Sequence, residues 1–245
     1  MSRVTRGNRQ QTRPRTARAG RPRRQNAAPD AHGTRARLFA AAAAEFAGHG
    51  FAGANVDRIA RAARVNKAMI YYHFRSKAAL YREILGDMFR AVSVRVHAVA
   101  DARQAPGDKL RGFIQAIAAE AEARPHFPPI WFREIAEGGT HLDQRTLLNI
   151  KSIVDVLAGI LRDGVAAGRF RPVNPLLLHG GIVAPLLLFF ATERLRTRIV
   201  RAGLRNVGSI TSAEVVAHVQ QVALAMVGAA RVSSGAGRVR VKGKR

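Results

Sequence analysis

The chain contains no cysteine and few acidic residues. None of its 245 residues is cysteine, which excludes disulfide bonds, thiolate metal sites and cysteine nucleophiles. Aspartate and glutamate total only 16 against 41 lysines and arginines, so the formal net charge is +25. An excess of positive charge this large indicates a polyanionic partner, most often nucleic acid and less often an anionic membrane.

Long apolar runs are also lacking. The longest apolar region, 175–191, is interrupted by a histidine, two glycines and a proline, so it falls short of a membrane-spanning helix. The N-terminus has no apolar segment of the secretory type. It is rich in arginine and poor in acid, so its composition is also compatible with a transit peptide. We therefore expect a soluble, cytoplasmic protein without a membrane partner.

The two ends of the chain carry much of the charge and little apolar surface. Residues 1–31 hold nine arginines and one acid, and residues 231–245 hold six lysines and arginines and no acid. Segments of this composition cannot bury enough surface to offset the cost of ordering them. We expect a disordered arm at 1–31 and a disordered tail at 231–245, each able to add nonspecific, salt-sensitive affinity for DNA.

The region between the two ends is predicted to be all-α, with about nine helices. Apolar residues recur at helical spacing, and no segment alternates convincingly with period two. Glycines at 48, 50 and 168 are expected to end helices. Helices are expected to begin next to residues that cap helix N-termini: Thr34, Asn55, Asn66, Ser76, Asp108, Asn174 and Thr211, the last with Glu214 in a capping box.

Two of the predicted helices form a helix-turn-helix unit. A short helix after Asn55 and another after Asn66 are joined by a tight turn and follow a longer helix. The second helix of such a unit lies in the major groove. Ile70 and Phe74 are spaced to dock it on the protein. This leaves polar-tipped side chains for the outer face.

The outer face of that second helix has the chemistry to contact DNA. The stretch VNKAMIYYHFRSKAAL places two tyrosines and a histidine side by side between two lysines. A tyrosine hydroxyl reaches a phosphate oxygen while its ring packs on sugar or a thymine methyl. Lys77 lies in the first turn of the next helix, where a phosphate meets both an ammonium and a helix N-terminus.

Residues 34–85 resemble the N-terminal domain of TetR-family transcriptional regulators. The resemblance runs without a gap, and its most telling parts are Phe46, Gly50 and Phe51, the Val65-Asn66-Lys67 turn and the segment 71–77. It implies operator contacts at these positions: Asn55, Lys67, Ala68, Met69, Tyr71, Tyr72, His73 and Lys77. Asn55 and Asn66 replace commoner hydroxyl residues but still cap, whereas Met69 is bulkier than usual, which puts base preference there in doubt.

The same resemblance implies a ligand-responsive homodimer, most often a repressor of a palindromic operator. The expected parts are a DNA-binding domain at 32–78 and an effector-binding and dimerisation domain at 79–230. Dimerisation is expected on the last two long helices, about 175–198 and 213–229. The segment HFPPIWFREIAEGG (126–139) resembles one that borders the ligand cavity in some members. The predicted cavity residues are apolar walls and polar anchors: Met88, Phe89, Phe127, Trp131, Phe132, Arg133, Glu134 and His141.

Other interpretations of the sequence stay open. The tyrosines, Trp131 and Phe132 are also compatible with core positions, and Arg133 and Glu134 with structural ion pairs. The charge alone is compatible with a nonspecific, chromatin-like DNA-binding protein. We find no nucleophile, metal or phosphate-loop constellation, and the glycines near Gly180 do not form a dinucleotide fingerprint. We therefore expect no enzyme activity, no cofactor and no metal.

Overall fold

The computed structural model describes residues 31–204 and 209–228, and within these ranges the chain is helical without any strand. Ten helices are present there, one more than the sequence predicts. In chain order they are α1 (Ala31–Gly53), α2 (Val56–Ala62), α3 (Ala68–Phe74), α4 (Lys77–Asp101), α5 (Pro106–Ala123), α6 (Phe127–Ala136), α7 (Gln144–Ala166), α8 (Pro175–Ala191), α9 (Glu193–Arg201) and α10 (Ser212–Val227). The predicted arm and tail lie outside the described residues.

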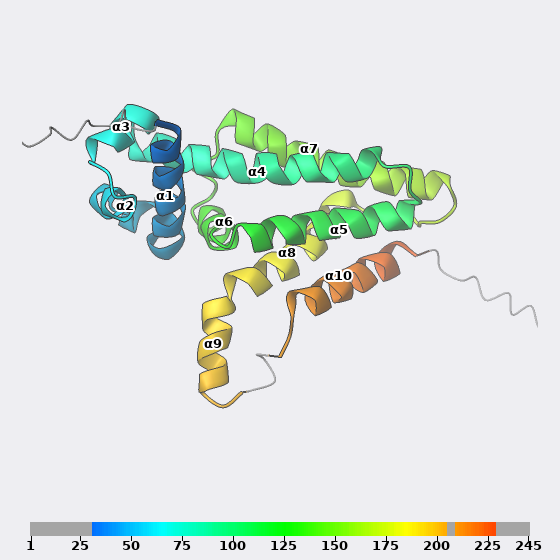
Figure 1. Ribbon diagram of the computed structural model, residues 1–245. Coiled ribbons are helices and arrows are strands. Elements are labelled where there is room, and N and C mark those ends of the chain that lie inside the picture. The colour runs from blue at the N-terminus through cyan, green and yellow to red at the C-terminus, as the bar shows by residue number, and fades with distance from the viewer. Residues whose placement is uncertain (1–30, 205–208, 229–245) are drawn as a thin grey trace, which may run out of the picture.

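The helices form a small N-terminal group and a larger bundle. Figure 1 shows α1, α2 and α3 gathered at one end of the molecule, with α4 leading from them into the bundle. In the bundle, α4 packs on α5 and α7, and α8 and α10 pack on α5 and on each other. Helix α6 lies between the two parts because it packs on both α1 and α8. Helix α9 contacts α8 and extends away from the bundle (Figure 1).

A continuous apolar core joins the two parts. It begins among Leu38, Phe46 and Ile59 in the N-terminal group and continues along α4 into the bundle. Tyr81 is 1% exposed and its ring packs edge-on against Phe46, with 4.7 Å between ring centroids. Since α4 contributes to the core at both ends, it is a rigid connection between the N-terminal group and the bundle.

Most predicted helix starts are confirmed. Asn55 accepts a hydrogen bond from the Asp57 N–H at 2.7 Å, and Ser76 accepts one from the Ala79 N–H at 3.0 Å. Asn174 caps α8, and the capping box before α10 is present. Asn66 accepts the Ala68 N–H at 2.9 Å, although Lys67 is the residue that immediately precedes α3. These starts depend on one side chain and its nearest backbone, which is why the sequence predicts them.

Two predicted caps are wrong. Thr34 is a buried residue inside α1, which already begins at Ala31. Asp108 lies in the first turn of α5, and its side chain does not cap that helix. The helix begins at Pro106 instead, since proline has its φ preset for the first helical position and lacks only an N–H that would stay unpaired there.

The predicted helix at 175–198 is also wrong, because the chain bends by 56° between α8 and α9. The Thr192 hydroxyl donates to the Leu188 carbonyl at 2.6 Å, and the Arg196 guanidinium donates to the Phe189 carbonyl. Side chains therefore occupy carbonyls at the end of α8. Among the described residues no single helix is long and apolar enough to cross a membrane, and only the bent α8–α9 pair passes that test of length and composition.

Candidate functional site

Helix α3 has one buried face and one exposed face. Ile70 is fully buried and Phe74 is 3% exposed, so both anchor the helix on the N-terminal group, as predicted. Tyr71 is 46% exposed and Tyr72 is 76% exposed. Burying Ile70 and Phe74 holds α3 in place while two phenol groups face solvent. Such a helix has the shape and chemistry of a DNA-reading element.

Three other predicted contact residues on or beside α3 are partly engaged with the protein itself. The Lys67 ammonium lies 3.0 Å from the Asp57 carboxylate, which raises the lysine pKa through that hydrogen bond. Met69 is half-buried and packs against the core. His73 is half-buried against Tyr72, with 5.1 Å between ring centroids. Among the described residues, its Nε2 is the one buried side-chain nitrogen or oxygen without a hydrogen-bond partner.

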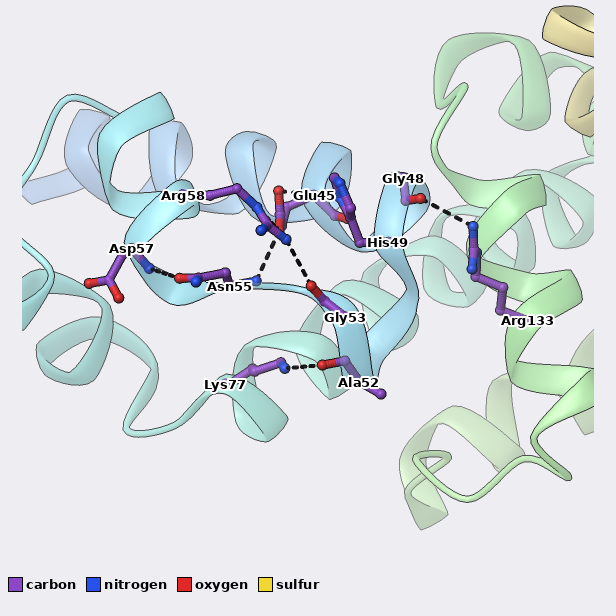
Figure 2. A network of polar contacts seen from close by, with 10 residues as sticks. All are labelled: Glu45, Gly48, His49, Ala52, Gly53, Asn55, Asp57, Arg58, Lys77 and Arg133. Carbon is purple, nitrogen blue, oxygen red and sulfur yellow. Dashed lines mark hydrogen bonds and ion pairs between the residues drawn. The ribbon is translucent and has the colours of Figure 1, made fainter.

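A polar network fixes α2 on α1 (Figure 2). The Glu45 carboxylate accepts the Asn55 N–H at 2.9 Å and the Arg58 guanidinium at 2.8 Å. Arg58 also donates to the Gly53 carbonyl at 2.8 Å. The hydrogen bond from Arg58 is the main cause that lowers the pKa of Glu45. Asn55 is thus held at both its backbone and its side chain, which positions the N-terminus of α2.

Basic residues that the sequence analysis did not single out surround α3. Arg61, Arg64 and Arg75 are exposed, and the latter two adopt positive φ angles of 56° and 65° at the turns that flank the helix. Non-glycine residues with positive φ are uncommon. The sequence places Arg64 and Arg75 at these two turns. With so many arginines in the chain, however, nothing in the sequence marked these two as possible DNA contacts.

The C-terminal turn of α1 meets the bundle. Gly50 has a φ of 70° and kinks α1, so the chain turns back toward α4 and α6. There the Lys77 ammonium lies 3.4 Å from the Ala52 carbonyl and over the Phe51 ring. Arg133 of α6 donates to the Gly48 carbonyl at 3.2 Å (Figure 2). The sequence analysis predicts Lys77 as a DNA contact and Arg133 as a pocket residue. In the structure both contact the C-terminal turn of α1.

A buried acid and a histidine complete this junction. Glu134 is fully buried and accepts the His141 N–H at 2.7 Å, and its second oxygen lies 3.1 Å from the His141 Nδ1. The His141 ring packs on Phe51, 4.1 Å between centroids. With Glu137, this is the group within the described residues whose ligand atoms lie close enough to hold a metal, all within 4.8 Å. The direct hydrogen bonds account for the arrangement of Glu134 and His141 without one.

A small apolar cavity of about 50 Å³, partly open to solvent, is lined by residues of α4, α5, α6, α7 and α8. Phe89 forms its aromatic side together with Phe127 and Trp131, at centroid distances of 5.5 and 4.7 Å. The complete lining is Phe89, Val92, Ile117, Phe127, Trp131, Ile150, Ile153, His179, Val183 and Leu187. His179 is the one ionisable residue in this lining, and burial lowers its pKa.

The structure brings three of the eight predicted pocket residues to this cavity: Phe89, Phe127 and Trp131. Met88 and Phe132 do not line it, and Arg133, Glu134 and His141 lie at the junction with α1 instead. Arg133, two positions after Trp131, points to the other side of α6 because of helical spacing. Glu134, three positions after Trp131, is instead held by its hydrogen bonds to His141. His179 was missed because it appeared only as an interruption of an apolar run.

Family comparisons cover most of the chain. A family model described as "Bacterial regulatory proteins, tetR family" matches residues 38–84, and one described as "Tetracyclin repressor-like, C-terminal domain" matches residues 106–227. The chain is 37% identical over 185 residues to the HTH-type transcriptional repressor SCO4008 of Streptomyces coelicolor, covering 74% of this chain and 86% of that protein. It is 29% identical over 137 residues to the repressor KstR2 of Mycolicibacterium smegmatis, covering 55% and 66%.

Solved structures show the same fold. KstR2 of Mycobacterium tuberculosis superposes with a TM-score of 0.64 at 22% identity, covering 80% of this chain and 95% of that one. PfmR of Thermus thermophilus, a TetR family transcriptional regulator, gives a TM-score of 0.61 at 24% identity, covering 77% of this chain and 97% of that one.

Proposed function

We propose that this chain, which belongs to the TetR family of bacterial regulatory proteins and is therefore a helix-turn-helix transcriptional regulator, is a repressor. In this proposal a small molecule enters the apolar cavity lined by helices α4 to α8 and releases the repressor from a palindromic operator. The observation that carries this proposal is helix α3, which is anchored by two buried side chains and presents two exposed tyrosines. Proteins of this family bind operator DNA and effectors and act as dimers.

We assign DNA binding to residues 32–78 and effector binding and dimerisation to 79–230. The boundary falls at the start of α4, after Ser76 caps it. The arginine-rich 1–31 and the basic 231–245 are assigned a supporting part, as added salt-sensitive attraction to phosphates. We assign sequence preference to α3, because it carries exposed tyrosines on a helix that two buried side chains anchor.

The proposed operator contacts fall into two groups. Tyr71 and Tyr72 face solvent and are free to reach phosphate and sugar. Lys67 must exchange its bond to Asp57 for a phosphate or a base edge. The remaining proposed contacts, on or beside the helix-turn-helix, are Asn55, Ala68, Met69, His73 and Lys77. The Lys77 ammonium also holds the end of α1, so a phosphate there would contact a group already positioned by the protein.

Helix α6 is the proposed connection between the cavity and the DNA-binding domain. Phe127 and Trp131 line the cavity, while Arg133 and Glu134 of the same helix hold the turn around Gly50 and the loop at His141. A molecule that displaces Trp131 shifts α6, and a shift of α6 moves contacts made to α1. An effector of this kind favours the arrangement whose two recognition helices no longer fit successive major grooves.

The operator-binding part of the proposal is tested by three single substitutions. Lys67→Ala and Tyr71→Phe are expected to weaken binding about fivefold or more, because each removes a group that donates to DNA. Binding is measured by gel-shift titration on a site recovered by selection from genomic fragments. Lys151→Ala is the matched control, since Lys151 is likewise an exposed lysine paired with an aspartate, Asp155, but on α7.

Folding is checked in each variant by circular dichroism. Unchanged affinity in both Lys67→Ala and Tyr71→Phe would remove the contact assignment. If affinity instead depended only on the two basic ends, so that a chain without 1–31 and 231–245 lost all sequence preference, the protein would be a nonspecific DNA-binding protein.

We also place the dimer interface on α8 and α10. Leu176 and Leu177 are 66% and 73% exposed, and Val222 and Met226 of α10 are 42% and 37% exposed. A methyl group added at Gly180 or Gly181 would meet no atom within 4 Å, so this part of α8 is open for a partner helix to approach closely. Exposed apolar side chains on adjacent helices of one face fit a self-complementary interface.

A further inference from the structure

The cavity of the proposed effector site offers an incoming molecule very little polar chemistry. Nine of its ten lining residues are apolar or aromatic, and none is a lysine, arginine, aspartate or glutamate. A charged molecule would leave water for this lining without gaining an opposite charge, which is costly. The cavity therefore favours an uncharged effector.

His179 is the polar exception in that lining. Its ring packs near Phe113, with 6.5 Å between centroids, and within the described residues its ring nitrogens make no hydrogen bond to the protein. The residue is half-buried and neither nitrogen is fully enclosed, in contrast to the His73 Nε2. Burial lowers the pKa of the imidazole, so at neutral pH the ring is uncharged and carries one donor and one acceptor. A polar group without a protein partner in an apolar wall is available to a ligand.

We propose, as a consequence of the proposed effector site, that the effector is an uncharged, largely apolar ring compound with one hydrogen-bonding group that pairs with His179. The ring system packs against Phe89, Phe127 and Trp131, whose mutual edge-on geometry forms one aromatic wall. His179 determines specificity by selecting compounds that carry a hydroxyl or a similar hydrogen-bonding group.

Two rival ligand classes are disfavoured by different features. An organic cation would gain from the aromatic rings, but no carboxylate lines the cavity and a net charge of +25 repels it. An organic anion is attracted to the protein by the same net charge, yet no lysine or arginine lines the cavity to receive it. Anions are therefore the stronger rival.

The size of the cavity adds a requirement. A volume of about 50 Å³ is far below the roughly 300 Å³ of a small ligand pocket. A ring compound must part the walls, and Trp131 is only half-buried on the short helix α6. Ligand binding is thus expected to change the environment of Trp131, which is the one tryptophan in the chain.

Four probes that share a phenyl ring and a three-carbon chain test the ligand class through Trp131 fluorescence of the full-length protein at neutral pH. They are 3-phenyl-1-propanol, the hydrocarbon propylbenzene, the anion 3-phenylpropionate and the cation 3-phenylpropylammonium. The alcohol is expected to bind at least about tenfold more tightly than either ion, because each ion is left unpaired in the cavity. Tighter binding of the anion or the cation, or no binding by any probe, overturns the proposal.

The variant His179→Leu tests the specificity residue. It is expected to weaken binding of the alcohol about fivefold or more relative to binding of propylbenzene, because only the alcohol loses a hydrogen bond. His32→Leu, at an exposed histidine of α1 outside both the cavity and the proposed dimer interface, is the matched control, and thermal unfolding confirms that each variant folds. Equal effects of His179→Leu on both probes contradict the role of His179.

A separate gel shift with the alcohol distinguishes this inference from the proposed function. Release of DNA by the alcohol supports both. Binding in the expected order without any change in DNA affinity supports the ligand class and contradicts the proposed switching.

Discussion

Single side chains with buried or fixed partners decide how the DNA-binding part is held together. Glu45 is the clearest case, because its side chain is 10% exposed and one of its oxygens accepts from both Asn55 and Arg58. These hydrogen bonds set the N-terminus of α2, and α2 supports α3. Lys67 and Asp57, by contrast, are both well exposed, and we propose that Lys67 exchanges this bond for one to DNA.

Glu45→Gln is expected to destabilise the protein by about 1–2 kcal/mol at neutral pH, because the charged acceptor of an arginine and a backbone N–H is lost. The free energy of unfolding is measured by urea titration at fixed protein concentration. Glu83→Gln is the control, since Glu83 is 41% exposed and pairs with Arg35 on the surface. There the expected loss is below about 1 kcal/mol.

The acid dependence of this difference follows from the sign of the pKa shift. The pKa of Glu45 is lowered from 4.5 in the folded protein, chiefly by the Arg58 hydrogen bond. Its contribution to stability is therefore complete above about pH 4.5 and is lost as the pH falls through the folded pKa. A difference between wild type and Glu45→Gln that grows in acid would contradict this assignment.

At the scale of the elements, the C-terminal ends of α1 and α7 each depend on a glycine for their contacts with the rest of the protein. Helix α1 ends in a kink at Gly50, where the DNA-binding part meets Arg133 of α6. Helix α7 ends where Gly164 lets the Phe170 ring lie against it, next to a β-bridge between Phe170 and Gly228. Each end needs glycine for a different reason, one for its φ angle and the other for space.

Gly50→Ala is expected to destabilise the protein by about 1–2 kcal/mol, because an L-residue resists a φ of 70° and the new methyl group would lie 3.3 Å from Arg133. Thermal and urea unfolding measure this effect. Gly48→Ala, two residues earlier, meets no atom within 4 Å and is expected to stabilise by up to about 1 kcal/mol. Equal effects of the two substitutions would show that the kink is not strained.

Gly164→Ala is expected to cost about 1–3 kcal/mol for a steric reason, since the added methyl group would lie 1.9 Å from Cδ2 of the buried Phe170 ring. Gly159→Ala in the same helix is the control, because its nearest neighbour is the flexible end of Arg162 at 3.7 Å. That control is expected to gain up to about 1 kcal/mol from helix propensity. Urea unfolding of both variants decides, and a neutral Gly164→Ala would contradict the packing argument.

The elements that the sequence predicts well are those fixed by neighbouring residues. The caps at Asn55, Ser76 and Asn174 and the inward positions of Ile70 and Phe74 depend on spacing of a few residues. The bend after α8 depends on which carbonyls Thr192 and Arg196 reach, and that pattern is not distinctive in sequence.

The candidate site divides in the same way. The outward face of α3 follows from helical spacing, whereas the cavity depends on how α4, α5, α6, α7 and α8 meet. Predicting the pocket mainly from the segment 126–139 therefore found Phe127 and Trp131 but also included Arg133 and Glu134, which contact α1 and the loop at His141. His179 comes from a helix nearly fifty positions away, so no local pattern connects it to Trp131.

At the scale of the whole molecule, exposed apolar side chains lie on α8 and α10, where we propose the dimer interface. Of the seven exposed leucines among the described residues, three lie on α8, at Leu176, Leu177 and Leu188, against two on α7, and α10 beside α8 exposes Val222 and Met226. The bend at Thr192 turns α9 out of this face, so the proposed interface involves α8 and α10 rather than one helix over 175–198. Two recognition helices are placed one DNA turn apart only when such an interface fixes the two protomers.

Leu177→Glu is therefore expected to convert the dimer to a monomer and to weaken operator binding at least about tenfold, because a buried carboxylate without a partner opposes association. Size-exclusion chromatography with light scattering measures the mass, and gel shift measures the affinity. Leu148→Glu is the matched control: Leu148 is 55% exposed, but it lies on α7, away from the proposed interface. A Leu177→Glu protein that stays dimeric, with Leu148→Glu dissociating instead, would move the interface to α7. Since both substitutions add the same charge at exposed leucines, the difference between them reports the position of the interface and not the effect of charge.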